Sequence, residues 1–292
     1  MRLSTVVIDV IGVLSTAGSL FIVSAGLTLV FGAMRLINIA HGSFYMYGAF
    51  LLTTIVGTAS GLRFWLALLA AAVIVALIGV AAELGVMRRI YQREHLTQLI
   101  ATFGLFLILA DLALHFWGSN SRTVSPPPGV AGHLTVAGAT FPSYDLVVIA
   151  AAVVTGVALW LLLQRTALGW RIRAAVEDPE TLAAGGTNLR LLRTGVFAVG
   201  ALLAGLSGAV IAPQVAVAPG MDNAIVVSAF LVAVIGGLGS VVGAAVGALV
   251  IGAAETIGTV VAPAWASAFI YLTMIVVLVV RPAGLFGIPE RA

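Results

Sequence analysis

The chain has 292 residues, of which 61% are hydrophobic and only 9% are charged, whereas soluble domains carry about 25% charged residues. Such a composition excludes an ordinary water-soluble protein. The chain has no cysteine, which excludes disulfides, thiolate metal sites and cysteine nucleophiles. All 14 basic residues are arginine, and the lack of lysine excludes a P-loop nucleotide site of the usual form and Schiff-base chemistry.

Nine apolar segments follow one another along the chain, and a bilayer-spanning helix needs about 20 such residues. Their apolar residues do not alternate with polar ones as in barrel strands, so helices are predicted. The seventh segment is short and the eighth follows at once, so these two are either half-helices or one broken span, and eight spans is the alternative count. The segments are Val10–Phe31, Leu36–Val56, Phe64–Gly85, Thr97–Phe116, Leu146–Leu163, Thr194–Ile211, Ala224–Leu238, Val241–Val260 and Ala266–Val280.

The first segment is expected to remain in the protein. Asp9 precedes it, and no clear small-x-small cleavage site ends it before Arg35. Both features are atypical of a cleavable signal peptide.

The second segment begins with a polar stretch. Asn38, His41 and Tyr45 are spaced i, i+3 and i+7, which would place them on one helical face. Unpaired polar groups are costly against lipid, so this face, with neighbouring Ser43, is predicted to point into the bundle. It is either an interhelical hydrogen-bond cluster or the lining of a substrate pathway. One histidine without a second ligand nearby does not indicate a metal site.

Three carboxylates lie in or near the predicted spans. Glu83 is close to Arg88 and Arg89 and is expected to form a surface ion pair. Asp111 and Glu255 lie on different segments with no basic residue at the same depth. They are predicted to make structural hydrogen bonds, and the alternative is a proton relay.

Arginines lie mainly between the segments, and cytoplasmic loops of membrane proteins are enriched in basic residues. This rule places the N-terminus outside, the C-terminus in the cytoplasm and the loop at about 117–144, which holds only Arg122, on the periplasmic side. The basic residues are thus assigned to topology and not to nucleic-acid binding. The clustered arginines are Arg88, Arg89 and Arg93; Arg165, Arg171, Arg173, Arg190 and Arg193; and Arg281 and Arg291.

The outer loop contains the run Pro126–Pro128, which favours an extended path over a helix. This loop is either a plain connector or a contact for an external partner.

The long inner loop at about 164–193 is predicted to contain a short helix. Asp178 is a suitable N-cap and Pro179 suits the first helical position. Gly185 and Gly186 would stop the helix. A short loop would suffice to join two spans, so the helix either docks a cytoplasmic partner or rests on the membrane surface.

Gly239, Gly243 and Gly247 recur every four residues, which predicts one helical face that permits close helix packing. The packing is either within the chain or at a subunit interface.

The chain resembles the permeases of branched-chain amino acid ABC importers, specifically the LivH-type subunit. The matching stretches occur in order along nearly the whole chain. Any single stretch is a weak signal, but the ordered set is specific. The stretches are Gly26–Gly32, Asn38–Gly42, Gln98–Gly104, Arg173–Asn188, Leu203–Gly208, Val234–Ser240 and Arg281–Gly287.

The predicted fold is therefore an all-α polytopic membrane protein with the ABC importer permease fold, in one transmembrane domain over residues 1–292. About eight or nine transmembrane helices are expected, some short or broken, with a cytoplasmic coupling helix. The resemblance implies a LivM-type permease subunit as partner in a heterodimer, two cytoplasmic ABC ATPase subunits and a periplasmic solute-binding protein. It also implies the bacterial inner membrane. The chain itself is expected to be non-catalytic and to hold no cofactor, because the ATPases bind ATP.

By the same resemblance the loop from Arg173 to Asn188 is the coupling element that contacts the ATPase. Two positions depart from the family pattern: Ser43 replaces a glutamate after His-Gly, and Thr187 replaces an isoleucine. The first departure bears on the substrate more than on the architecture. The candidate coupling residues are Arg171, Arg173, Glu177, Asp178, Gly186 and Asn188.

The expected function is ATP-driven import by alternating access of a small polar solute, namely branched-chain or other hydrophobic amino acids. The same type of permease carrying urea, short amides or aromatic acids is the alternative. An ion-coupled secondary transporter would need paired intramembrane charges and internal repeats, which the sequence does not clearly show. A membrane enzyme with His41 as base would turn substrate over as an isolated chain.

Overall fold

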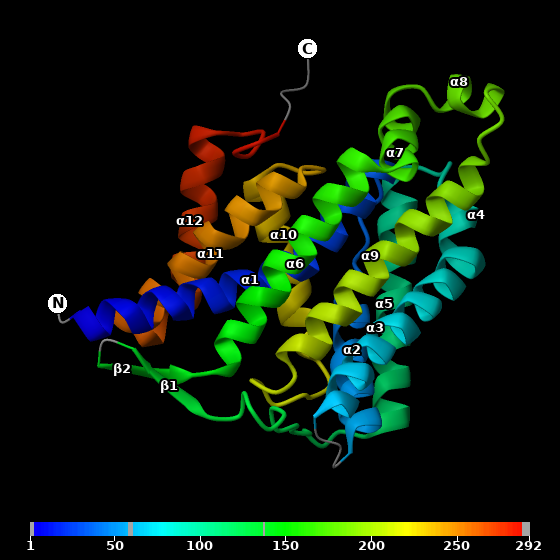
Figure 1. The fold of residues 1–292 in the computed structure, drawn as a ribbon. Helices are drawn as coiled ribbons and strands as arrows, with labels where there is room; N and C mark the ends of the chain where they lie inside the picture. Colours follow the sequence, from blue (N-terminus) through cyan, green and yellow to red (C-terminus); the bar gives the residue numbers. More distant parts are fainter. Residues whose placement is uncertain (1–2, 58–60, 137, 288–292) are drawn as a thin grey trace.

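The computed structural model describes residues 3–57, 61–136 and 138–287, and Figure 1 shows long helices that cross the molecule side by side. The elements are α1 (Leu3–Met34), α2 (His41–Val56), α3 (Leu62–Ala82), the π-helical turn η1 (Glu83–Met87), α4 (Arg88–Ile90), α5 (His95–Trp117), β1 (His133–Val136), β2 (Ala139–Pro142), α6 (Tyr144–Arg165), α7 (Ala167–Glu177), α8 (Pro179–Ala184), α9 (Leu189–Ile211), α10 (Met221–Gly236), α11 (Val241–Val261), the 3-10 turn η2 (Pro263–Trp265) and α12 (Ala266–Val280).

Each of the nine predicted segments corresponds to a helix. Within the described residues, 7 helices are long and apolar enough to cross a membrane. The remaining two, α2 and α10, have 16 residues each. The prediction of short elements is thus confirmed, and α10 and α11 are separate helices packed on each other rather than one broken span.

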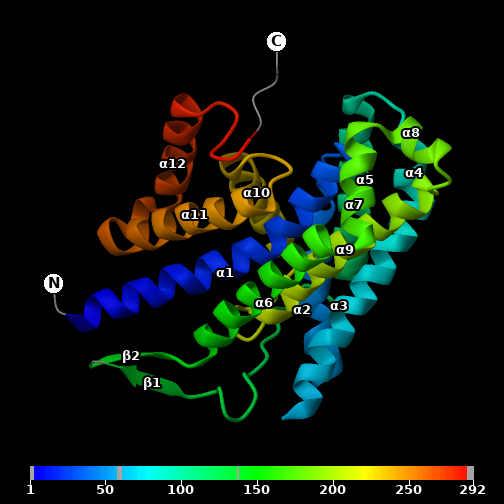
Figure 2. The same ribbon diagram turned by 45° about the horizontal axis from the view of Figure 1, so that its top comes forward.

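Helices α1, α2 and α9 form the centre of the bundle. Helix α1 packs against α6, α9, α10 and α11, while α9 also packs against α2 and α3. Helices α3 and α5 cover one side, and α10 to α12 cover the other, as both ribbon views show (Figures 1 and 2). No residue of α12 is buried, so this helix lies at the edge of the chain.

Glycines allow α2 and α9 to pack with their backbones almost in contact. A Cβ atom added at Gly48 would lie 2.0 Å from the carbonyl oxygen of Gly205, and one at Gly208 would lie 1.9 Å from that of Tyr45. Helices in membranes gain much of their association energy from such close packing, because lipid provides little hydrophobic driving force.

The three regularly spaced glycines do not share one helix, which corrects the sequence prediction. Helix α11 begins at Val241, and Ser240 caps it because its hydroxyl accepts a hydrogen bond from the Gly243 amide. Gly239 therefore precedes the helix, with a φ of 89°. Gly243 and Gly247 do lie on α11, where they approach the backbone of α10 at Gly236. The observed packing of these two glycines is within the chain.

The second segment also starts later than predicted. Residues 35–38 are not helical, and Arg35 has a φ of 50°. Asn38 therefore lies before α2, and the expected shared helical face of Asn38, His41 and Tyr45 is wrong. A turn at residues 39–40 leads into this helix, and no side chain caps it.

Residues 117–144 contain more regular structure than a connector needs. Strands β1 and β2 pair antiparallel, with His133 opposite Pro142 and Val136 opposite Ala139. Earlier in the loop, Arg122 forms two backbone hydrogen bonds of 2.8 Å with Val217. The chain is mainly helical, and this hairpin is the one departure from an all-α fold in the described residues.

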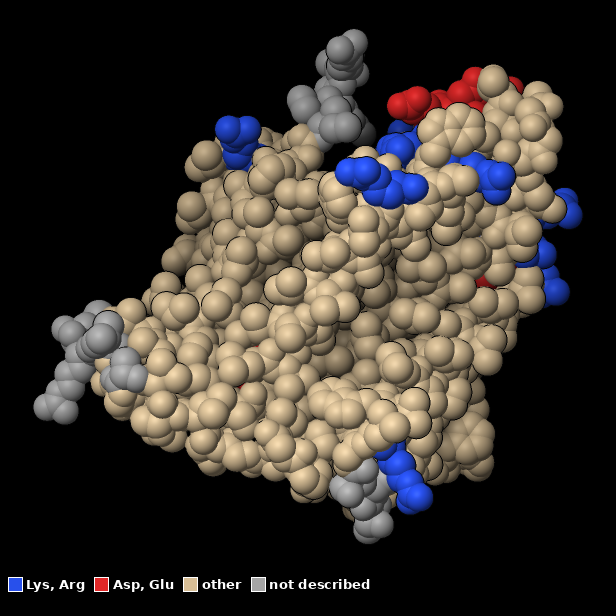
Figure 3. Space-filling view, viewed as in Figure 1, with Lys and Arg blue, Asp and Glu red and all other residues tan. Residues whose placement is uncertain are grey.

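Charged side chains gather at one end of the molecule, opposite the hairpin. Figure 3 shows a visible face almost without charge, a concentration of basic and acidic residues where α7 and α8 lie, and a basic residue at the other end. Helix α1 begins at the hairpin end, and α12 ends at the charged end (Figure 1). We call the end with α4, α7, α8 and the start of α9 the arginine-rich end. Arg291 lies outside the described residues.

Candidate functional site

The polar residues predicted on the second segment are buried inside the chain. Asn38, His41, Ser43 and Tyr45 are each at most 5% exposed. His41 donates a hydrogen bond from Nε2 to the backbone carbonyl of Val23 on α1, at 2.9 Å. Although Asn38 is not on the helix, all four residues occupy the helix-packed interior.

Ser43 contacts a carboxylate that sequence reasoning missed. Its hydroxyl donates to Oδ2 of Asp222 at 3.3 Å, and Asp222 is only 1% exposed, in the first turn of α10. The sequence contained a signal for this residue, because Asp222 is the one charged residue between Arg193 and Glu255. We call Asn38, His41, Ser43, Tyr45 and Asp222 the interior cluster.

Gly42 brings the two halves of the interior cluster together. A Cβ atom at this position would lie 2.4 Å from the Asp222 carbonyl oxygen and 2.8 Å from Cβ of Val226. Only glycine permits that approach, and it places α2 close enough for Ser43 to reach α10.

The interior cluster is incompletely hydrogen-bonded. Within the described residues, Oδ1 of Asn38 and Nδ1 of His41 are buried without a hydrogen-bond partner, as are the hydroxyls of Ser24 and Thr28 on α1. Each such group costs about 1–3 kcal/mol. Orphaned buried groups are rare in proteins and call for an explanation such as an unaccounted water or ligand.

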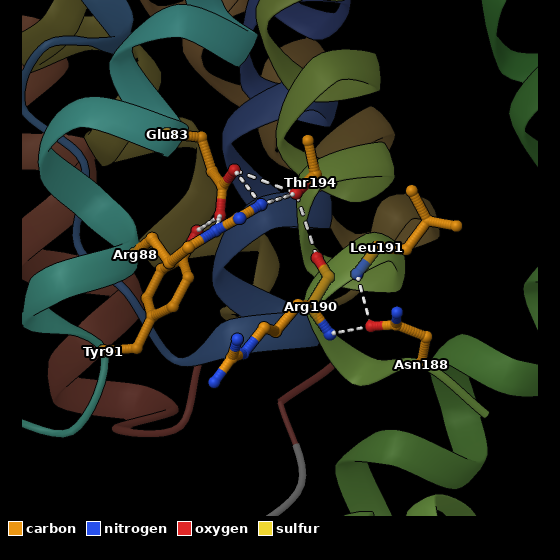
Figure 4. A network of polar contacts seen from close by, with 7 residues as sticks. All are labelled: Glu83, Arg88, Tyr91, Asn188, Arg190, Leu191 and Thr194. Carbon is orange, nitrogen blue, oxygen red and sulfur yellow. Dashed lines mark hydrogen bonds and ion pairs between the residues drawn. The ribbon is translucent and has the colours of Figure 1, made fainter. Parts of the chain in front are cut away.

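A second polar network joins η1 to α9 at the arginine-rich end (Figure 4). The Glu83 carboxylate accepts hydrogen bonds from Thr194 Oγ1 at 2.8 Å, from Tyr91 at 3.2 Å and from Arg88 Nη2 at 3.2 Å. Arg88 Nη2 also donates to Thr194 Oγ1 at 2.9 Å. We call these four residues the Glu83 network.

The expected surface ion pair of Glu83 is in fact a buried one. The Glu83 side chain is 0% exposed, whereas that of Arg88 is 37% exposed. Burial follows because Glu83 points toward α9 (Figure 4) and not toward solvent. Burial and the Glu83 charge raise the pKa of Tyr91, which keeps the phenol protonated as a donor.

The other two carboxylates form no hydrogen bond with any described residue, so the predicted structural hydrogen bonds are not found. Glu255 is half-buried, and Asp111 is exposed on the outward side of α5. No group of three or more metal-ligating side chains occurs in the part of the chain that the structure describes.

The short helix predicted in the loop at about 164–193 is confirmed as α8. Asp178 caps it by accepting a 3.0 Å hydrogen bond from the Thr181 amide, and α8 ends at Ala184, before Gly185 and Gly186. Hydrogen bonds from the Thr181 hydroxyl and amide lower the pKa of Asp178, so the cap stays ionised near neutral pH.

Helix α7, which precedes α8, was not predicted. The Thr166 hydroxyl caps it by accepting from the Gly169 amide. Its Ile172 is buried, as is Leu182 of α8, and both belong to a hydrophobic cluster shared with α1 and α9. Apolar residues of α7 lie on both its buried and its exposed sides, since Ile172 is buried while Trp170 and Val176 are exposed, so no single apolar face predicted this helix.

All six candidate coupling residues are exposed and lie on or beside α7 and α8. Some of them also hold the local structure. Asn188 Oδ1 accepts from the amides of Arg190 and Leu191 and so caps α9 (Figure 4). Arg173 donates to the carbonyl of Leu163.

Comparison with known proteins gives one consistent result. A model of the family described as branched-chain amino acid transport system / permease component matches residues 10–278. The high-affinity branched-chain amino acid transport system permease protein BraD of Pseudomonas aeruginosa is 29% identical over 288 residues, covering 94% of each chain. The corresponding LivH protein of Escherichia coli is 28% identical over 296 residues, also covering 94% of each.

A probable branched-chain amino acid transport permease protein LivH of Methanocaldococcus jannaschii is 25% identical over 292 residues, covering 95% of this chain and 91% of the relative. No solved structure gives a significant match to the chain.

Proposed function

Because this chain belongs to the family of branched-chain amino acid transport permease components, we propose that it forms part of the membrane channel of an ATP-driven importer. The proposed substrates are branched-chain or other hydrophobic amino acids, in line with the names of its relatives. The chain is a multi-pass membrane protein and a transport permease subunit. The proposed location is the bacterial inner membrane, with the arginine-rich end in the cytoplasm.

The observation that carries this proposal is the family match together with the exposed α7–α8 segment. This segment is anchored to the bundle by apolar residues such as Ile172 and presents its charged residues outward. A connector between α6 and α9 does not need two helices. The arrangement is suited to a cytoplasmic ATPase that binds α7–α8 and transmits movement to α1 and α9.

A second permease subunit is proposed to cover α5. Phe103, Leu107, Asp111 and Leu114 follow one another on one side of α5, and all four are exposed. A carboxylate that faces lipid within a spanning helix costs about 2.5–3.5 kcal/mol. A partner subunit or a water-filled pathway along this side would remove that cost.

The interior cluster is proposed to line the substrate pathway in another conformation. Its orphaned atoms on Asn38 and His41 could bind water or the polar groups of a substrate when the helices separate. Alternating access requires two packings of similar free energy that ATP binding and substrate bias in turn.

The test is uptake of radiolabelled leucine by proteoliposomes that contain the chain with its partner subunits and a solute-binding protein. Uptake should require internal ATP and should survive a protonophore and a sodium ionophore. Uptake that continues without ATP and collapses with an ionophore would favour an ion-coupled transporter. Competition by unlabelled leucine, urea and an aromatic acid then identifies the substrate class.

Glu177→Arg tests the docking segment. The change reverses an exposed charge at the end of α7, so the permease should fold normally while copurification with the ATPases falls at least tenfold. Glu94→Arg is the matched control, since Glu94 is an exposed acid at the same end, outside α7 and α8. Normal copurification in Glu177→Arg, or an equal loss in both variants, would contradict the assignment.

A further inference from the structure

A pocket at the arginine-rich end lies between η1–α4 and the start of α9. Its volume is about 340 Å³, and its lining includes Arg88, Arg89, Arg190 and Arg193. The rule that cytoplasmic loops are basic requires arginines in those loops. It does not require arginines from two distant segments of the sequence to meet at one pocket.

The charges around this pocket are not balanced. Glu83 is its one acidic lining residue, and the Glu83–Arg88 pair is the one ion pair within the described residues. Arg89, Arg190 and Arg193 therefore have no carboxylate partner there. Arginine remains charged at any physiological pH, so the excess positive charge cannot be relieved by losing a proton.

Neighbouring side chains hold two of the pocket's arginines in place. The guanidinium of Arg88 is fixed by Glu83 and Thr194 (Figure 4). On the other side, Arg193 lies over the Tyr91 ring, with Cζ 5.4 Å from its centroid. Several guanidinium groups that converge on one site bind phosphate oxygens well, because each can donate two parallel hydrogen bonds.

Exposed apolar residues precede the pocket residues in the chain, on η1 and α3. Leu84 lies four residues before Arg88 and is 46% exposed, and Leu77, seven residues earlier, is 64% exposed. These positions follow one another on roughly one side of the helix. Free phosphate would gain nothing from that surface, whereas acyl chains would bury it. Basic pockets beside membrane helices are known binding sites for anionic headgroups.

We infer that this pocket binds the phosphate headgroup of an anionic phospholipid, whose acyl chains lie along α3 past Leu84 and Leu77. Arg89 and Arg190 are the principal ligands of the phosphate, since both are exposed and lack an ion-pair partner among the described residues. The bound lipid would neutralise the pocket and join η1–α4 to the start of α9, next to the coupling segment. This inference does not depend on the transported substrate.

The test measures lipid binding to the purified transporter with all its subunits. The complex is delipidated in detergent and titrated with dioleoylphosphatidylglycerol or dioleoylphosphatidylcholine, and bound lipid is counted by native mass spectrometry. The wild type should prefer phosphatidylglycerol. The double variant Arg89→Gln/Arg190→Gln should bind it about thirtyfold more weakly, because each arginine near an anionic headgroup contributes roughly fivefold.

Two matched variants separate charge from folding. Arg281→Gln removes an exposed arginine outside the pocket and should leave the lipid preference unchanged. Arg89→Lys/Arg190→Lys keeps the charges and should retain most of the preference. Thermal melting of each complex shows whether it is folded, and the lysine variant keeps the test decisive if the glutamine variant unfolds.

Four outcomes would overturn the inference. The wild type could bind the two lipids equally well, or the glutamine variant could keep the preference. Inorganic phosphate could displace phosphatidylglycerol at similar concentrations, which would show a soluble anion as the ligand. The glutamine variant could keep its lipid and lose the ATPases, which would show that the pocket docks a protein.

Discussion

The interior cluster and the Glu83 network are both made of polar residues within apolar helices, yet they are satisfied to different degrees. The Glu83 carboxylate has three side-chain donors around it. In the interior cluster, Asn38 and His41 each keep a buried atom without a partner among the described residues. A network whose polar groups are all hydrogen-bonded stabilises one arrangement of its helices. Buried polar groups without partners are instead expected where side chains change partners during function.

The helices around the two regions are also packed differently. The interior cluster lies between helices whose backbones touch at glycines, such as Gly42 against α10 and Gly208 against α2. The Glu83 network joins its helices through long side chains and borders an open pocket. Substitutions should therefore act by steric overlap in the interior and by loss of charge pairing at the arginine-rich end.

The largest effect is expected from Gly208→Ala. The added Cβ would lie 1.9 Å from the Tyr45 carbonyl oxygen, so α2 and α9 must separate, at a cost of about 3 kcal/mol. Gly195→Ala on the same helix is the control, because nothing lies within 4 Å of its Cβ position. Thermal melting of the detergent-purified complex measures both, and equal melting temperatures would show that α2 and α9 are not in backbone contact.

Glu83→Gln should have the next largest effect. It removes the charge partner of Arg88, and breaking a buried pair costs about 3–5 kcal/mol. Arg88 is 37% exposed and can recover water, so a loss of about 2 kcal/mol in the free energy of unfolding is expected. Glu94→Gln, at an exposed position of the same end, should change it by less than about 0.5 kcal/mol. The idea of a stabilising network fails if the two variants melt alike.

Asn38→Leu should have the smallest effect on stability and a clear effect on transport. The side chains are similar in shape and the amide oxygen has no partner, so the free energy of unfolding should change by less than about 1.5 kcal/mol. Leucine uptake at constant expression should nevertheless fall if Asn38 lines the pathway. Thr155→Val, at a buried threonine of α6 outside the interior cluster, is the control and should leave uptake unchanged. Full uptake in Asn38→Leu would assign the interior cluster to structure alone.

Much of the helical framework could be predicted from sequence, because long uncharged runs leave few alternatives to spanning helices. Limits set by short-range chemistry were also predictable, as the Asp178 cap of α8 shows. The errors concern helix starts and partners. Helix α2 begins at His41 instead of Leu36. The start of α11 at Val241 was predicted correctly, but Gly239 lies before this helix and not on its predicted glycine face. Residues 36–40 are mostly apolar, so hydrophobicity alone does not mark the start of α2.

The sequence identified residues of the candidate sites but not their hydrogen-bond partners. His41 and Ser43 are buried as expected, but no pattern near them indicated Val23 or Asp222 as partners. Glu83 was expected to pair with Arg88 and does, yet its burial depends on Thr194, 111 residues away. The sequence shows that a carboxylate is present, but it does not show which helix the side chain will face.

The sequence by itself determined that this chain crosses a membrane many times and that the loop between α6 and α9 contains a helix bounded by Asp178 and Gly185. Both follow from local properties, namely the solvent preference of apolar runs and the hydrogen bonds of helix ends. Tertiary structure alone decided that Ser43 meets Asp222, that Glu83 is buried and that four arginines share a pocket. These contacts depend on which helices pack together, and that choice comes from surfaces formed only after the helices exist.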